Sequence, residues 1–228
     1  MKKIMFNERY GLESAVLNGR KTMTRRMVKL PMLPIVSNLD KMVDAEVGIS
    51  TVNGKVMATL YGYNVEGRYP ICDVTPHYQI GEEVAIAQSY EDLANSRFSK
   101  DLDMFDSPTT IKKAYCDKGW RNKMFVKAEH MPHRIRITNI GIEPLTQITN
   151  DDAMLEGVFK YDKPPLHHES DMYAPWPPYV KPYKNDTDNL KYFCEARWAF
   201  KHLINKVSGG YTWISNPWVW VYTFKLIK

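Results

Sequence analysis

A lysine, a threonine and three arginines lie close together near the start of the chain, in the segment Gly-Arg-Lys-Thr-Met-Thr-Arg-Arg over residues 19–26. The neighbouring cations disfavour the charged form of Lys21, and any burial acts in the same direction. A neutral lysine beside a hydroxyl can act as its base, so Lys21 and Thr24 are candidates for a base and a nucleophile. The alternative interpretation of this segment is a basic turn that precedes a strand.

This chemistry depends on a geometric condition. Side chains alternate between the two faces of a regular strand, so Lys21 and Thr24 would point in opposite directions if both lay in one. They can meet only if Lys21 lies on the turn before the strand or if the strand is bulged.

Glu156 is the third candidate for catalysis. It falls at the C-terminal end of a short predicted helix, where the helix macrodipole disfavours negative charge. A carboxylate in that position is poised to exchange protons. The alternative is a glutamate of the last turn that faces solvent.

Positive charge is concentrated at the N-terminus. The first thirty residues contain eight basic and two acidic side chains, a local charge of +6, whereas the whole chain carries +5. Such an excess attracts phosphate groups, which favours nucleic acid as a partner. A solvated basic face would have the same composition.

The elements that must position these residues follow from periodicity and from turn signals. We predict helices over residues 7–19, 149–157 and 188–207, the second capped by Thr149. We predict strands over residues 4–6, 22–28, 55–63, 84–88, 134–142 and 217–226. Few helices, many strands and no βαβ rhythm predict an α+β, mainly β protein built on a small barrel. We expect one domain over residues 1–228, with insertions near 30–52, 91–122 and 160–186.

One aromatic-rich segment and one proline-rich segment bear on this architecture. Trp218, Trp220, Tyr222 and Phe224 alternate along the last predicted strand, which favours core packing over base stacking. Six prolines between residues 161 and 183 argue against regular structure there. That segment is interpreted as a surface insertion or as a lid over the site.

Several classes of protein are excluded by composition. No run of eighteen apolar residues occurs, which argues against a membrane protein, and an acidic residue close to the N-terminus argues against a secretory signal. Three widely spaced cysteines support neither a disulfide framework nor a structural zinc site. The histidines show no ligand spacing. We therefore expect a cytoplasmic protein that uses no metal and no cofactor.

The segment from Phe6 to Arg26 resembles the N-terminal signature of ASCH-domain proteins, especially the larger versions found in phages and prophages. Three later blocks agree with that family in order, at residues 81–90, 130–158 and 216–221. The resemblance implies a PUA-like β-barrel with a basic cleft for RNA or a modified nucleoside. A small bacterial ASCH enzyme hydrolyses the acetyl amide of N4-acetylcytidine, and its catalytic lysine, threonine and glutamate fall on Lys21, Thr24 and Glu156.

The resemblance also suggests which residues bind the substrate. Arg26 matches the arginine of the family motif and is expected to position the substrate or to stabilise an oxyanion. We assign Arg20, Arg25 and Gln88 to binding as well. Larger relatives carry an Arg-Glu pair where this chain has Ala87 and Gln88, so the role of that strand is expected to differ.

Three functions remain open at this point. The first is an amidohydrolase that acts on N4-acetylcytidine or a similar nucleoside. The second is a non-catalytic RNA-binding module in which Lys21, Arg25 and Arg26 hold phosphates, and the third is a ribonuclease.

Overall fold

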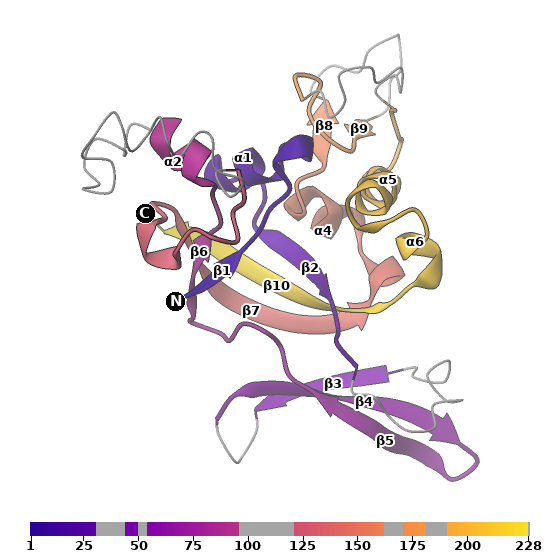
Figure 1. The fold of residues 1–228 in the computed structure, drawn as a ribbon. Helices are drawn as coiled ribbons and strands as arrows, with labels where there is room; N and C mark the ends of the chain where they lie inside the picture. Colours follow the sequence, from indigo (N-terminus) through magenta and orange to yellow (C-terminus); the bar gives the residue numbers. More distant parts are fainter. Residues whose placement is uncertain (31–43, 50–53, 96–120, 162–170, 181–190, 228) are drawn as a thin grey trace.

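A computed structural model describes residues 1–30, 44–49, 54–95, 121–161, 171–180 and 191–227 of the chain (Figure 1). The expected insertions near 30–52, 91–122 and 160–186 lie largely outside these ranges. The described part is α+β with mainly strands, as predicted.

A five-stranded sheet in the order β1-β6-β7-β10-β2 forms the centre of the fold. Its strands are β1 (Lys2–Ile4), β2 (Met23–Met27), β6 (Glu83–Ile86), β7 (Arg134–Pro144) and β10 (Trp218–Ile227). Strand β1 pairs with β6 in parallel, and the other neighbours are antiparallel. Strand β2, which carries Thr24, is therefore an edge strand.

Strand β7, predicted over residues 134–142, contains an irregularity of the sheet. Ile135, Ile137 and Ile140 are all buried, although strict alternation would put Ile140 on the opposite face. The register of β7 with β10 shifts between Thr223 and Phe224. One extra residue in β7 thus turns Ile140 back to the core.

A second, three-stranded antiparallel sheet contains β3 (Asp44–Ile49), β4 (Val56–Asn64) and β5 (Gly67–Val74). It lies beneath β7 in Figure 1 and is connected to the rest of the fold between β2 and β6. The predicted alternation of β4 is confirmed, because Val56, Ala58 and Leu60 are buried. No strand was predicted between residues 28 and 55, and β3 corrects this, because it completes the sheet by pairing with β4.

The strands do not close into a barrel within the described residues; they form open sheets of five, three and two strands. The two-stranded sheet pairs β8 (Phe159–Tyr161) with β9 (Met172–Ala174). The expectation of irregular structure over residues 161–183 is thus wrong at β9. The prolines in this segment lie outside β9, so its backbone groups are free to pair.

The described α-helices are short except for one. They are α1 (Leu12–Leu17), α2 (Tyr90–Asn95), α4 (Asn150–Leu155), α5 (Ala196–Ser208) and α6 (Thr212–Ser215). Single 3-10 turns lie at Glu8–Tyr10, Ala128–His130 and Leu145–Gln147.

Two helix predictions can be compared with these elements. Thr149 caps α4 as predicted, since its Oγ1 accepts a hydrogen bond from the Asp152 amide at 3.1 Å. Helix α5 begins later than residue 188: Phe193 is held extended by two backbone hydrogen bonds with Tyr173, of 2.8 and 2.9 Å. Residues 188–190 of that prediction lie outside the described ranges.

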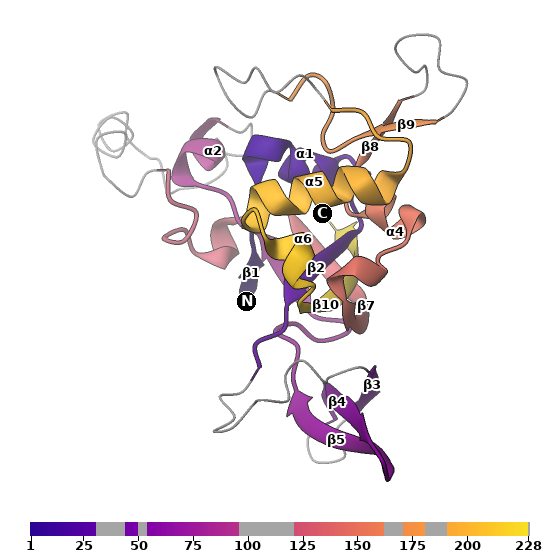
Figure 2. The same cartoon turned by 90° about the vertical axis from the view of Figure 1, so that its right-hand side faces the viewer.

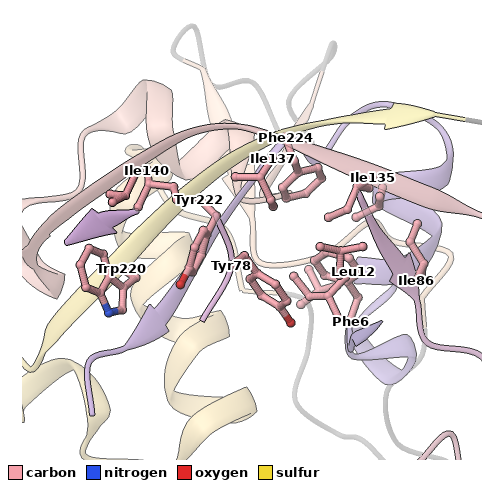
Figure 3. Packing of buried hydrophobic residues seen from close by; sticks show 14 of the residues in the cluster. Phe6, Leu12, Tyr78, Ile86, Ile135, Ile137, Ile140, Trp220, Tyr222 and Phe224 are labelled. Carbon is pink, nitrogen blue, oxygen red and sulfur yellow. The ribbon is translucent and has the colours of Figure 1, made fainter. Parts of the chain in front are cut away.

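The largest hydrophobic cluster joins the five-stranded sheet, the three-stranded sheet and the N-terminal helix (Figure 3). Trp220, Tyr222 and Phe224 of β10 are buried in it, which confirms the prediction of core packing for that strand. A second cluster lies between β10, α4, α5 and α6. Figure 2 shows α5 crossing the front of the molecule, close to β2 and β10. No helix in the described part of the chain is long and apolar enough to cross a bilayer.

Candidate functional site

A pocket of about 340 Å³ lies between the edge strand β2, the end of α4 and helix α5, and Lys21, Thr24 and Glu156 all line it. The three side chains assigned to catalysis therefore share one pocket. Lys21 and Glu156 are 135 residues apart in the sequence. Arg25 and Arg26 line it as well. Its apolar wall comes from Phe6, Leu12 and the side of α5 that bears Phe200, Leu203, Ile204 and Val207.

Lys21 lies on the turn before the strand, which is one of the two arrangements that allow it to meet Thr24. Gly19 ends the first helical segment with a positive φ of 76°, and the Lys21 amide donates to the Ala15 carbonyl at 2.8 Å. Lys21 thus lies on the turn before β2 and is not bound to the alternation of the strand. Thr24 lies within β2, opposite Tyr222 of β10.

Lys21 forms a buried ion pair with Glu156. The Lys21 Nζ donates to Glu156 Oε2 at 2.6 Å and to the backbone oxygens of Glu156 and Met23, both at 2.7 Å. All three protons of the ammonium thus have acceptors. Burial lowers the pKa of Lys21, and the attraction of Glu156 opposes that effect.

Arg25 binds the same glutamate from a different direction. Its guanidinium contacts Glu143 at 2.7 Å, Asp152 at 3.0 Å and Glu156 at 3.3 Å. Burial disfavours the charge, but the carboxylates together outweigh it and raise the pKa of Arg25. Glu156 thus joins two buried cations, each through a different oxygen.

Glu156 reaches this position because it directly follows the last residue of α4. It is the C-cap residue of the helix, as predicted, but only 4% of it is exposed, so the solvent-facing alternative is wrong. Gly157 follows with a φ of 101°. A Cβ at that residue would lie 3.4 Å from two carbons of the Lys21 side chain. Gly157 thus reverses the chain and leaves room for Lys21.

The predicted binding residues are found in three different environments. Arg26 lines the pocket and donates to the Met5 carbonyl at 2.5 Å. Arg20 does not line it and donates to the Gly157 carbonyl. Gln88 is buried outside the pocket lining, where its Nε2 donates to Glu13 Oε1 at 3.2 Å, so direct contact with a ligand is not supported.

Two residues that the sequence did not indicate complete the pocket region. Lys123 lines the pocket and forms ion pairs with Glu13, at 2.5 Å, and with Glu8. Burial, with a contribution from Asp92, raises the pKa of Glu13 to about 7, and burial lowers that of Lys123 to about 8. The ion pair stabilises both charges and so opposes both shifts. No local signal in the sequence relates positions 13 and 123.

The charges around the pocket nearly cancel. Four cations line it, namely Lys21, Arg25, Arg26 and Lys123. Five carboxylates, namely Glu8, Glu13, Glu143, Asp152 and Glu156, form ion pairs with three of these cations, and Arg26 donates to a backbone carbonyl instead. Ion pairs therefore neutralise most of the positive charge of this pocket.

The described residues contain no group of three or more His, Cys, Asp or Glu side chains that could hold a metal ion. Comparison of the chain with protein-family models, curated proteins and solved structures found no match.

Proposed function

We propose that the protein is an amidohydrolase that removes an acyl group from the base of a nucleoside such as N4-acetylcytidine. The observation that carries the proposal is the buried Lys21–Glu156 pair, which shares a pocket with the Thr24 hydroxyl and the Arg26 guanidinium. The resemblance of these residues to the ASCH family supports the same activity and a PUA-like origin of the fold.

The pocket suits an uncharged ligand of nucleoside size. Its volume of about 340 Å³ is at the lower end of the range for small-molecule sites. Phe6 and the apolar side chains of α5 can cover the face of a base. Since carboxylates neutralise Lys21, Arg25 and Lys123, a phosphate would gain little there. This is why we favour a nucleoside over phosphates held by Lys21 and Arg25.

The first step is a proton transfer within the buried pair. An ammonium with three acceptors cannot accept a proton, so Lys21 must first lose one. The carboxylate of Glu156, at 2.6 Å, is the nearest acceptor. A ligand that displaces water lowers the local dielectric constant, which disfavours the two separated charges and favours the neutral amine and acid.

Acyl transfer then follows. Neutral Lys21 accepts the proton of Thr24 as the threonine Oγ1 forms a bond to the carbonyl carbon, and Arg26 stabilises the oxyanion. The C–N bond breaks, and the amino nitrogen of the base leaves with the proton held by Lys21. Water then attacks the threonine ester and gives one proton to neutral Lys21, which passes that proton to Thr24 Oγ1 as the ester bond breaks. The product is acetic acid, which loses its remaining proton to solvent as acetate. Glu156 returns its proton to Lys21.

Incubation of the purified protein with N4-acetylcytidine, followed by chromatography of released cytidine, tests the proposal. Thr24→Val, which keeps the shape and removes the hydroxyl, should abolish release. Lys21→Met should lower kcat by about 10²- to 10⁴-fold, the usual contribution of a general base. Thr223→Val, on the neighbouring strand and outside the pocket lining, is the matched control and should retain the wild-type rate.

Failure of the wild type to release cytidine would reject this substrate, and full activity of Thr24→Val would reject the nucleophile. Shortened RNA fragments, formed without added metal, would favour the ribonuclease.

A further inference from the structure

Helix α5 separates two pockets. One stripe of its side chains, at residues 200, 203, 204 and 207, lines the pocket described above. A second stripe, at residues 198, 201, 202 and 205, lines another pocket of about 290 Å³, together with Lys191 and Phe193. Both stripes have the spacing of one helical face, and they are offset by two residues, which is about 200° around the helix. The second pocket, called the outer pocket here, is thus on the opposite side of α5.

An exposed tryptophan lines the outer pocket. Trp198 is 41% exposed, whereas Trp176, Trp213 and Trp220 are buried. The Lys201 Nζ lies 5.2 Å from the centre of its ring, and the guanidinium carbon of Arg197 lies 5.5 Å from it. A ring that is open to solvent and flanked by cations is the type of surface on which proteins stack nucleic-acid bases.

The cations of the outer pocket differ from those of the inner one. Within the described residues, neither Lys191 nor Lys201 forms an ion pair with a carboxylate, and no acidic side chain lines the outer pocket. The remaining lining residues are Phe193, His202 and Asn205. Positive charge that has no carboxylate partner among the described residues and lies beside an open ring is complementary to a phosphate attached to an aromatic base.

We propose that the outer pocket binds a nucleotide of single-stranded RNA, with its base stacked on Trp198 and its phosphates held by Lys191 and Lys201. The Lys201 side chain is long and flexible, so it can move from the ring to a phosphate when a base takes its place. An acidic peptide fits less well, because the walls are mainly apolar and aromatic and supply few hydrogen-bond donors for a peptide backbone. The proposal does not depend on the hydrolytic function of the inner pocket.

Binding of a fluorescently labelled decauridylate, measured by anisotropy over a series of salt concentrations, tests this site. Two phosphate contacts predict that the logarithm of the affinity falls with the logarithm of salt concentration with a slope of about −1.4. Trp198→Ala should weaken binding by about 5- to 150-fold, the range for loss of one stacked base. Trp198→Phe should recover most of that loss. The double variant Lys191→Ala/Lys201→Ala should bring the slope close to zero.

Matched controls lie on other elements. Tyr63→Ala removes an aromatic side chain of β4 that is 55% exposed, and Lys225→Ala removes an exposed lysine of β10. Both should bind as the wild type does. Thr24→Val should also bind RNA normally, which separates this site from the hydrolytic one.

Three results would overturn the proposal. The first is the absence of RNA binding at low salt, and the second is unchanged affinity in Trp198→Ala. The third is equal competition by inorganic polyphosphate or polyglutamate, which would reduce the pocket to a patch of positive charge without preference for a base.

Discussion

The two sides of α5 differ in whether their cations are paired with carboxylates. On the inner side Lys21 and Arg25 are buried, and each is bonded to carboxylates. On the outer side Lys191 and Lys201 have no ion-pair partner among the described residues, and an exposed Trp198 lies beside them. The comparison teaches that a cluster of basic residues in the sequence does not locate a phosphate site. A basic cluster can bind phosphate only if the fold does not already pair its residues with carboxylates.

Burial explains why the inner side needs its acids. Removing a charged group from water costs several kcal/mol, and only a partner at hydrogen-bond distance offsets that cost. The inner cations are therefore held in fixed geometry, which suits proton transfer and acyl chemistry. The outer cations have no carboxylate partner among the described residues, which suits reversible contact with a charged polymer.

The largest expected difference between the two sides is in stability. Lys21→Met removes one partner of a buried pair and leaves the carbonyls of Met23 and Glu156 without a donor. The free energy of unfolding should fall by roughly 3–5 kcal/mol. Lys201→Met makes the same chemical change on the outer side and should alter it by less than about 0.5 kcal/mol. Urea denaturation of both variants measures the difference, and equal effects would remove the distinction between the two sides.

A second prediction concerns pH at the Glu13 end of the inner pocket. The pKa of Glu13 is raised from 4.5 to about 7, so the folded state holds this proton more tightly than the unfolded chain does. Stability should therefore fall as pH rises from about 4.5 to about 7, by at most about 3 kcal/mol. The ion pair with Lys123 reduces that loss.

Glu13→Gln keeps the shape of the neutral side chain and is the comparison for this prediction. The difference in unfolding free energy between it and the wild type should change between pH 5 and pH 7.5, in favour of the variant at the higher pH. A difference that stays constant over that range would show that Glu13 does not titrate there.

The smallest expected effect concerns the glycine beside Lys21. Gly157→Ala places a side chain at a φ of 101° and against Lys21, and it should cost about 1–3 kcal/mol. Gly210→Ala, just after the end of α5, meets no atom within 4 Å and should change stability by less than about 1 kcal/mol. Thermal unfolding of the two variants distinguishes these outcomes. A loss in Gly210→Ala as large as that in Gly157→Ala would contradict this account.

The elements that the sequence predicts well are those with local signals. Thr149 and the acids after it mark the start of α4, and the alternation of β4 marks its buried face. Strand β3 carries Asp44, Glu46 and Gly48, which are rare in strands, so only its pairing with β4 reveals it. Local composition could not supply that pairing.

The candidate site shows the same division. The motif and the family resemblance pointed to Lys21, Thr24 and Glu156, which share a pocket. The acids Glu143 and Asp152, which neutralise Arg25, lie more than a hundred residues away from it and carry no signal in the sequence. Gln88 was assigned to binding through the family resemblance, and it contacts Glu13 instead. The pairing of charges that are distant in the sequence is the feature of the site that could not be predicted.

The three-stranded sheet has a consequence for attempts to shorten the chain. It is interposed between β2 and β6, so an engineer would be tempted to replace it with a short linker. Yet Val56, Ala58, Leu60 and Val74 are at most 7% exposed and belong to the same hydrophobic cluster as Trp220 and Tyr222. A truncated version would leave those two rings facing water, and the smallest unit worth expressing therefore retains this sheet.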